Sequence, residues 1–436
     1  MQLRDGVLSV PETGHDKPIP PANEPPGFLP DIAGCIDSLC PSLWPLNSFI
    51  HENPELGFQE HRAHDALTAF VRSHPGWKVT SSAYGMATAW EAVYDTGRPG
   101  PVVAFNAEMD ALPNLGHACG HNLIAVASLA AALATAHILY AHHLPGKVVL
   151  LGTPAEEGGG GGKIRCLEAG AYEDVDATII SHPGILNNSP MVRTTAYTRI
   201  EATYHGRAAH AANAPWMGIN ALDALVIAYN AISALRQQTR PDDVIGLQIT
   251  DGGNRPNVIH ERAAGVAVLR AATASRLAEL QRKVEACFRA GADAAGATVE
   301  LRVVPGYKDH VPNRVLAASY RRYWEALPGH IEPALPPVSV FTYVKASTDQ
   351  GNLSYALPSV NVSFAIPPGE ARGQPHSPDF EKASATREAF DRAMRVAKAM
   401  AGMAVDLCAT SGLLEEVRSQ WRHDMEEFGG RMETSA

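Results

Sequence analysis

Short apolar runs alternate with helix-like segments in the first half of the chain, and this alternation limits the folds open to it. Residues 101–106, 147–152 and 176–181 predict strands, and residues 121–140 and 162–169 between them predict helices. An order of strand, helix and strand favours a parallel sheet with helices on both faces. In open sheets of this kind, functional side chains gather beyond the carboxyl ends of the strands.

The pattern changes between residues 195 and 306, where strands and helices follow the order β-α-β-β-α-β. That order is typical of a split ferredoxin-like sandwich, so we expect an inserted α+β domain over 195–306. The catalytic α/β domain then consists of residues 34–194 and 307–436. The elements expected in the insertion are strands 198–204, 243–250, 263–270 and 297–304 and helices 217–238 and 275–291; those expected after it are strands 338–344 and 360–366 and a helix over 384–408.

The amino-terminal segment is rich in proline. Residues 11–30 carry seven prolines and few large apolar groups, so this stretch cannot bury enough surface to offset its ordering entropy. We therefore predict an extended arm over residues 1–33.

Composition narrows the function classes. The chain has 436 residues, 45% of them hydrophobic, which suits a soluble protein of two domains. A formal charge of −10 gives no basic surface for nucleic acid, so a small-molecule substrate fits better. No apolar run approaches the roughly 20 residues that span a bilayer, and the first residues lack the features of a signal peptide. We expect a cytoplasmic protein without a membrane partner, whose six scattered cysteines are buried thiols or ligands.

Metal-ligating side chains follow each of the three parallel strands. The first strand leads to a Cys-Gly-His sequence, the second to a pair of glutamates, and the third ends on a histidine. One thiolate, three imidazoles and one carboxylate suffice to hold two metal ions with open positions, as catalytic zinc sites require. The candidate ligands are Cys119, His121, one of the pair Glu156 and Glu157, His182 and, after the last strand, His376.

Each of these residues also has a plain structural reading. Cys119 could fill the core, His182 and His376 could lie in loops, and the two glutamates could cap a helix dipole. To exclude a metal site, all of these separate explanations would have to be true at once, for residues that lie at matching strand ends. We therefore favour the metal site. The glycine run 158–162 is not a phosphate loop, because Glu157 and Ile164 break that pattern, and it predicts close backbone packing instead.

The adjacent pair Glu156 and Glu157 has a mechanistic logic. One carboxylate binds metal while the other takes a proton from the attacking water and returns it to the leaving amine. Asp110 is expected to orient a ligand imidazole, since ligating histidines usually donate their other N–H to a carboxylate; an equally good alternative is that it caps a turn.

These motifs resemble the zinc aminoacylase and glutamate-carboxypeptidase superfamily, in the amidohydrolase branch of auxin-conjugate hydrolases, aminobenzoyl-glutamate hydrolase and β-alanyl dipeptidases. The resemblance covers roughly residues 34–408. It implies Cys119, His121, Glu157, His182 and His376 as the metal ligands, with Glu156 as general base. The matching segments are His51-Glu-Asn-Pro-Glu, Met109-Asp-Ala-Leu-Pro, His117-Ala-Cys-Gly-His, Pro154-Ala-Glu-Glu-Gly, His210-Ala-Ala and His376-Ser-Pro.

The resemblance further implies that the inserted domain is a lid through which a homodimer forms. His210 matches a lid histidine that reaches the neighbouring subunit's site and stabilises the oxyanion. Asn257 and Arg270 match lid positions that hold a substrate carboxylate.

Two departures bear on the substrate. Asn122 stands where auxin-conjugate hydrolases carry Asp, and residues 347–354 replace their acidic-Phe pair. Both features look more like the dipeptidase branch acting on β-alanyl or ω-amino conjugates.

The expected function is hydrolysis of an amide bond in an N-acyl amino acid, amino acid conjugate or small dipeptide. One alternative is an amide-forming or transacylating enzyme with the same site. Another is a binding module without catalysis, but the presence of Glu156 argues against this second alternative. Two divalent ions are expected, zinc first because of the thiolate, with manganese or cobalt as alternatives.

Overall fold

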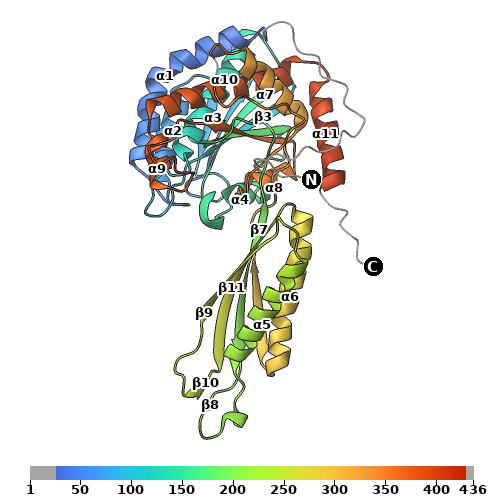
Figure 1. The fold of residues 1–436 in the computed structure, drawn as a ribbon. Helices are drawn as coiled ribbons and strands as arrows, with labels where there is room; N and C mark the ends of the chain where they lie inside the picture. Colours follow the sequence, from blue (N-terminus) through green and yellow to red (C-terminus); the bar gives the residue numbers. More distant parts are fainter. Residues whose placement is uncertain (1–25, 330, 429–436) are drawn as a thin grey trace. The chain divides into compact units, whose positions relative to one another are not determined.

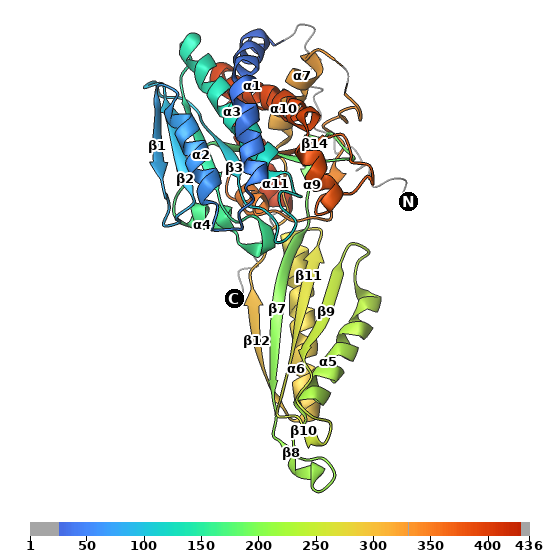
Figure 2. The ribbon, with the colours of Figure 1, turned by 90° about the vertical axis from the view of Figure 1, so that its left-hand side faces the viewer.

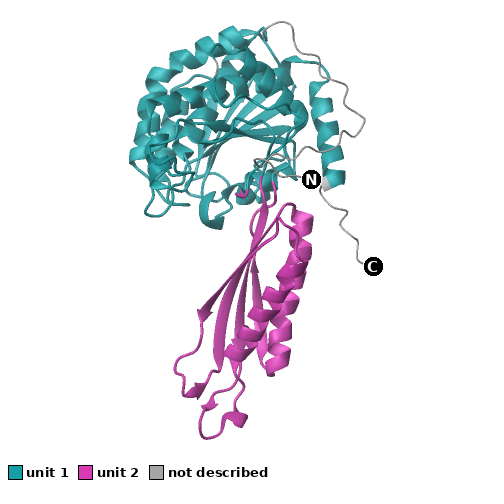
Figure 3. Ribbon diagram, in the orientation of Figure 1, with its two compact units in different colours: residues 1–193, 310–344, 348–427 teal, residues 194–309, 345–347, 428–436 magenta. Residues whose placement is uncertain are grey.

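The computed structural model describes residues 26–329 and 331–428, whose elements are labelled in Figure 1. The chain forms two compact units, shown in separate colours in Figure 3. Unit 1 contains the described residues up to Arg193 together with His310–Val344 and Thr348–Glu427. Unit 2 contains Thr194–Asp309 and Lys345–Ser347.

A six-stranded sheet in the order β1-β2-β4-β3-β5-β14 forms the centre of unit 1. Strands β4, β3, β5 and β14 run parallel, and β2 and β1 extend the sheet by antiparallel pairing. The sheet is therefore mostly parallel, as the sequence predicts. Its strands are β1 (Trp77–Ser81), β2 (Trp90–Asp95), β3 (Val102–Glu108), β4 (Lys147–Thr153), β5 (Ala177–Gly184) and β14 (Ser359–Ala365).

Helices cover both faces of this sheet, which is why its parallel strands read as continuous apolar runs. In β4, Val148 and Leu150 join the larger core beneath α1, α3 and α10, while Val149 and Leu151 join a smaller core on the opposite face. Figure 2 shows α1, α3 and α10 side by side. The helices of unit 1 are α1 (Leu29–Glu52), α2 (His61–Arg72), α3 (His121–Ala141), α4 (Gly162–Glu168), α7 (Arg314–Ala326), α8 (Gln350–Ser354), α9 (Pro378–Ser384), α10 (Arg387–Ala409) and α11 (Leu413–Phe428).

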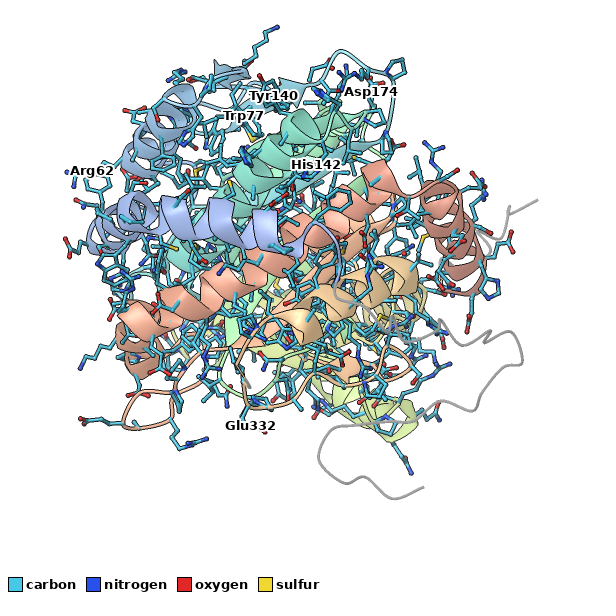
Figure 4. The ribbon with its side chains drawn as sticks, turned by 90° about the horizontal axis from the view of Figure 1, so that it is seen from above. Arg62, Trp77, Tyr140, His142, Asp174 and Glu332 are labelled. Atoms are coloured by element: carbon cyan, nitrogen blue, oxygen red, sulfur yellow. The ribbon has the colours of Figure 1, made fainter. Side chains whose placement is uncertain are left out.

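Helix α3 corrects one expectation. An 18-residue window of this 21-residue helix has a mean hydropathy of 1.9, so by length and composition alone the helix could span a membrane, contrary to the prediction that no apolar run is long enough. However, 89% of its apolar window is buried inside the protein. Helix α3 packs against α1, α10 and the sheet, and its end is tied to α1 by His142, whose Nε2 lies 2.8 Å from Asp31 Oδ2 (Figure 4). This is the setting of a core helix.

Other expectations about the elements of unit 1 are also corrected. Helix α1 begins at Leu29, within the range predicted as an extended arm, because Pro30 lies in the first turn where no amide hydrogen is needed. The rest of that arm, residues 1–25, lies outside the described residues. The strand expected over 338–344 is limited to β13 (Thr342–Tyr343), which pairs with the two residues of β6 (Val192–Arg193).

Unit 2 is an α+β sandwich. Its antiparallel sheet has the order β12-β7-β11-β9, and α5 and α6 pack on it around a separate apolar core. With the chain order β-α-β-β-α-β, this is the ferredoxin-like arrangement that the sequence predicts. The elements are β7 (Ala196–His205), β8 (Ala209–His210), α5 (Ala221–Leu235), β9 (Val244–Asp251), β10 (Val258–Ile259), β11 (Arg262–Ala271), α6 (Ala274–Ala295) and β12 (Thr298–Val304).

Candidate metal centre

The Cys-Gly-His turn lies at the amino terminus of α3, after β3. Gly120 has a φ of +76°, a conformation that a side chain strains. A Cβ at Gly120 would also lie 2.5 Å from Cγ of Pro183, which follows His182 on β5. Glycine at this position thus lets the turn carrying Cys119 and His121 approach the end of the neighbouring strand.

The structure brings all five expected ligands together in two overlapping groups. The ligand atoms of Cys119, His121 and His182 lie within 4.8 Å of one another, and so do those of Cys119, Glu157 and His376. The Sγ atom of Cys119 is 3.6 Å from Nε2 of His182, and Nε2 of His376 is 3.1 Å from Oε1 of Glu157. Because Cys119 belongs to both groups, its sulfur lies where two ions would share one ligand.

The backbone holds His376 in an unusual conformation. Its φ is +70°, and its N–H donates a hydrogen bond of 2.8 Å to the Ala118 carbonyl, next to Cys119. The imidazole is half exposed, whereas His121 is fully buried. The group containing His376 and Glu157 is therefore the more accessible side of the centre.

Asp110 connects two of the candidate ligands. Its Oδ1 lies 3.2 Å from Nδ1 of His121, and its Oδ2 accepts the backbone N–H of Glu157 at 2.9 Å. With Nδ1 engaged by a carboxylate, the ring presents Nε2 to the centre.

The two adjacent glutamates have opposite acidities. Burial raises the pKa of the Glu156 carboxyl well above its ordinary value, and the Glu108 and Glu157 carboxylates add to the rise. Burial also works to raise the pKa of Glu157, but the imidazoles of His376 and His121 outweigh it and lower that pKa. Two neighbouring groups with separated pKa values suit different roles, one holding a proton and one remaining an anion.

The glycine run beside these glutamates packs closely on the backbone, as the sequence predicts. A Cβ at Gly162 would lie 1.6 Å from the carbonyl oxygen of Pro154, and one at Gly160 would lie 2.5 Å from that of Ala155. Ala155 itself has a φ of +53°. The tight turn at residues 154–162 thus presents Glu156 and Glu157 to the centre.

The donor set fits divalent metal ions. It combines a thiolate, imidazoles and carboxylates, which are the usual ligands of zinc and related metals. Two buried atoms at the centre, Nε2 of His121 and Oε2 of Glu108, lie 3.3 Å apart as an ion pair, and neither has a hydrogen bond within the described ranges. Buried polar atoms without hydrogen bonds are costly, so a cation between them would offset that cost.

Sequence reasoning missed three charged residues behind the centre. Glu108, Lys163 and Asp349 are fully buried, and Nζ of Lys163 lies 2.6 Å from Oε1 of Glu108 and 2.5 Å from Oδ1 of Asp349. One signal was available, because Glu108 ends a buried strand two residues before Asp110 and so lies on the same side of that strand.

Unit 2 carries the three expected lid residues. His210 on β8 is exposed, and its Nδ1 accepts the N–H groups of Ala212 and Asn213, so Nε2 is left to donate. Asn257 is also exposed, and its backbone carbonyl accepts a hydrogen bond from the N–H of Ala211, the residue after His210.

Arg270 is placed differently within unit 2. It lies near the carboxyl-terminal end of β11, where it pairs in register with Tyr197. The strands β8 and β10 of the small sheet follow and precede the other ends of β7 and β11, respectively. Its Nη1 donates to Oγ of Ser347, and its guanidinium lies over the Tyr197 ring. Within this unit the structure therefore groups His210 with Asn257 and separates Arg270 from both.

Comparisons with known proteins agree with this geometry. The sequence profile described as Peptidase family M20/M25/M40 matches residues 104–402. The chain is 38% identical to the Xaa-Arg dipeptidase of Mus musculus, over 90% of this chain and 91% of that protein. It is 28% identical to one of the subunits of the p-aminobenzoyl-glutamate hydrolase of Escherichia coli, over 85% and 90% of the two chains.

A solved structure shares the fold. A dinuclear metal-binding peptidase of Bacillus subtilis superposes with a TM-score of 0.65 at 19% identity, over 86% of this chain and 99% of that one.

Proposed function

The chain belongs to the Peptidase family M20/M25/M40, and from this premise we propose that it hydrolyses small dipeptides at a dinuclear metal centre. It is a metal-dependent hydrolase acting on amide or peptide bonds. The comparisons give no support to the alternative of an amide-forming enzyme. The observation that carries the proposal is the convergence of Cys119, His121, Glu157, His182 and His376 beside Glu156.

Each side chain has a role in this proposal. Cys119, His121 and His182 would hold one ion, and Cys119, Glu157 and His376 would hold the other. Bound ions would lower the pKa of water and polarise the scissile carbonyl. Asp110 fixes the orientation of the His121 ring and of the turn that carries Glu157.

Glu156 performs the proton transfers. As a carboxylate it takes a proton from the attacking water, and as a carboxylic acid it gives that proton to the leaving amine. Its raised pKa supports the second step, because burial favours the protonated form of the carboxyl group.

The lid residues act across a homodimer. Nε2 of His210 is an outward-facing donor, as an oxyanion ligand must be. The separation of Arg270 from His210 and Asn257 within one unit is consistent with lid residues that serve the sites of two different subunits. In this arrangement Arg270 holds the substrate carboxylate by a bidentate pair, and His210 and Asn257 come from the partner.

The first substrate class to test is a dipeptide with a basic carboxyl-terminal residue. A mammalian relative named for Xaa-Arg dipeptides is 38% identical, whereas an auxin-conjugate hydrolase of Arabidopsis thaliana is 28% identical. Asn122 supports the distinction from auxin-conjugate hydrolases. Its Nδ2 donates to Oδ1 of Asn47 and to the Ser384 carbonyl, and the Asp found in those enzymes has no hydrogen to donate.

Metal and location complete the proposal. We take zinc as the resident metal because a thiolate is shared, with manganese or cobalt as alternatives to be settled by elemental analysis. All six cysteines are free thiols, which supports a reducing compartment such as the cytoplasm.

The decisive test is the Glu156→Gln variant. Because glutamine cannot exchange the proton, turnover is expected to fall by about 10²-fold or more while metal content stays unchanged. Glu157→Gln is the matched control and should also lower metal content. Activity is read as amine released from arginyl-terminated dipeptides, β-alanyl dipeptides and acyl-amino acids. Undiminished turnover in Glu156→Gln would contradict the assigned role.

A further inference from the structure

The carboxylate of Glu108 has no role in the scheme above, although it faces the centre. Glu108 is the last residue of β3 and is fully buried. Its Oε1 accepts the Lys163 ammonium at 2.6 Å, while its Oε2 has no hydrogen-bond partner among the residues that the structure describes. This buried carboxylate oxygen instead faces Nε2 of His121, one of the proposed ligands, and is therefore aimed at the centre.

The position of Oε2 fits a ligand atom. It lies 3.3 Å from Nε2 of His121, and the ligand atoms of Glu108, His121 and Glu156 all lie within 4.8 Å of one another. Two ligand atoms bound to the same zinc ion at about 2.0–2.1 Å in tetrahedral geometry are about 3.3 Å apart. The spacing of Oε2 and Nε2 is thus that of two atoms on one ion.

The carboxylate is also held in place from behind. Lys163 is fully buried, its Nζ lies 2.5 Å from Oδ1 of Asp349, and its backbone N–H donates to Oδ2 of the same residue at 2.8 Å. Lys163 is thereby fixed to Asp349 at two points and offers Nζ to Glu108. Lys163 thus holds Oε1 of Glu108 from behind and leaves Oε2 directed at the His121 side of the centre.

We propose that Glu108 is a sixth metal ligand, whose Oε2 binds the ion held by His121, and that Lys163 and Asp349 are positioning residues for it. The inference rests on the metal centre of the proposed function and adds a hard oxygen donor to its buried side. Oxygen donors favour manganese more than they favour zinc. Glu108 should therefore matter more for manganese binding than for zinc binding.

The test is metal binding by the full chain after chelator treatment. Manganese and zinc are titrated separately, with competition against a chromogenic chelator, into the wild type and Glu108→Gln. In this variant the amide oxygen can still accept from Lys163, while the amide nitrogen replaces Oε2. The expected result is a loss of at least about 10-fold in the affinity of one of the two ions, larger for manganese than for zinc. Unchanged affinities in a folded Glu108→Gln protein would overturn the proposal.

Two controls make the result specific. Asp406→Asn removes a different buried carboxylate, on α10 and bonded to Tyr323 of α7, and should leave both affinities unchanged. His121→Ala tests the centre itself. If it leaves metal binding intact, the proposed centre is wrong, whereas loss in His121→Ala without loss in Glu108→Gln refutes only the sixth ligand.

The positioning role has its own readout. In the Lys163→Met background, the further change Glu108→Gln should cost much less metal affinity than it does alone, since both changes disturb the same ligand. Additive losses would show that Lys163 acts on folding and not through Glu108. Thermal unfolding of each variant separates a loss of affinity from a loss of structure.

Discussion

At the scale of single residues, His310 makes part of the stability of unit 1 depend on pH. The ring is fully buried, with Nδ1 2.9 Å from the Val192 carbonyl and Nε2 3.2 Å from Oγ of Ser359. Burial lowers the pKa of His310 to about 4. Because an unfolded histidine titrates near 6.5, the unfolded chain binds the extra proton first, and stability is lost as the pH falls from about 6.5 toward 4.

We expect the His310→Asn variant to lose this pH dependence, since asparagine can donate to Val192 but does not titrate. Urea unfolding of chelator-treated protein at pH 6.5 and pH 5 measures the effect. The wild type should lose about 1.6 kcal/mol more than the variant between these two values. Equal losses would mean that His310 is not the group responsible.

The structure brings together the residues expected as ligands, each of which lies at or just beyond a strand end, or in a motif close to one. Sequence reasoning missed the charged residues whose partners are remote. Lys163 could not be predicted, since it ends a glycine-rich run that has the appearance of a loop. Its partners Glu108 and Asp349 are 55 and 186 positions away. Only the folded chain shows that these three charges share one buried site.

At the scale of elements, substitution of alanine for two helical glycines is expected to change the stability of the protein in opposite directions. A Cβ at Gly402 of α10 would lie 2.3 Å from Cδ1 of Tyr323 on α7, and that ring is held by its hydroxyl, which donates to Asp406. Gly34 of α1 has no atom within 4 Å of the same position.

Gly402→Ala is therefore expected to destabilise the protein by about 1–3 kcal/mol through overpacking. Gly34→Ala should stabilise it by up to about 1 kcal/mol through helix propensity alone. Chemical unfolding of the two variants beside the wild type measures both changes. Stabilisation by both substitutions would show that α7 and α10 are less closely packed than the structure indicates.

The elements that could be predicted from sequence are those with a strong apolar pattern. The parallel strands and α3 are buried on all sides, so their sequences are continuously apolar. Strand 338–344 was predicted on the same grounds and is wrong, because two prolines precede it and β6 offers only two residues for pairing. Helices α7 and α11 were not predicted. Their sequences are mixed, and the burial that stabilises them comes from tertiary packing.

At the scale of the whole molecule, the assignment of His210 to a partner's site can be tested by complementation. His210→Ala and Glu156→Gln should each be nearly inactive alone. Mixing them under conditions that allow subunits to exchange should restore activity, since some mixed dimers would hold one site with both residues intact. The same mixture is followed by light scattering to establish the dimer. No recovery from an exchanging dimer would place His210 in its own subunit's site or outside any site.

The two ends of unit 2 lie next to each other. The N–H of Tyr197 donates to the carbonyl of Tyr307 at 2.9 Å. The segment of 109 residues between these two tyrosines therefore begins and ends at nearly the same point. An insertion with neighbouring ends can be exchanged or lost in one genetic event without rerouting the strands that carry the ligands. Evolution can thus retain an inherited reaction while it replaces the inserted module.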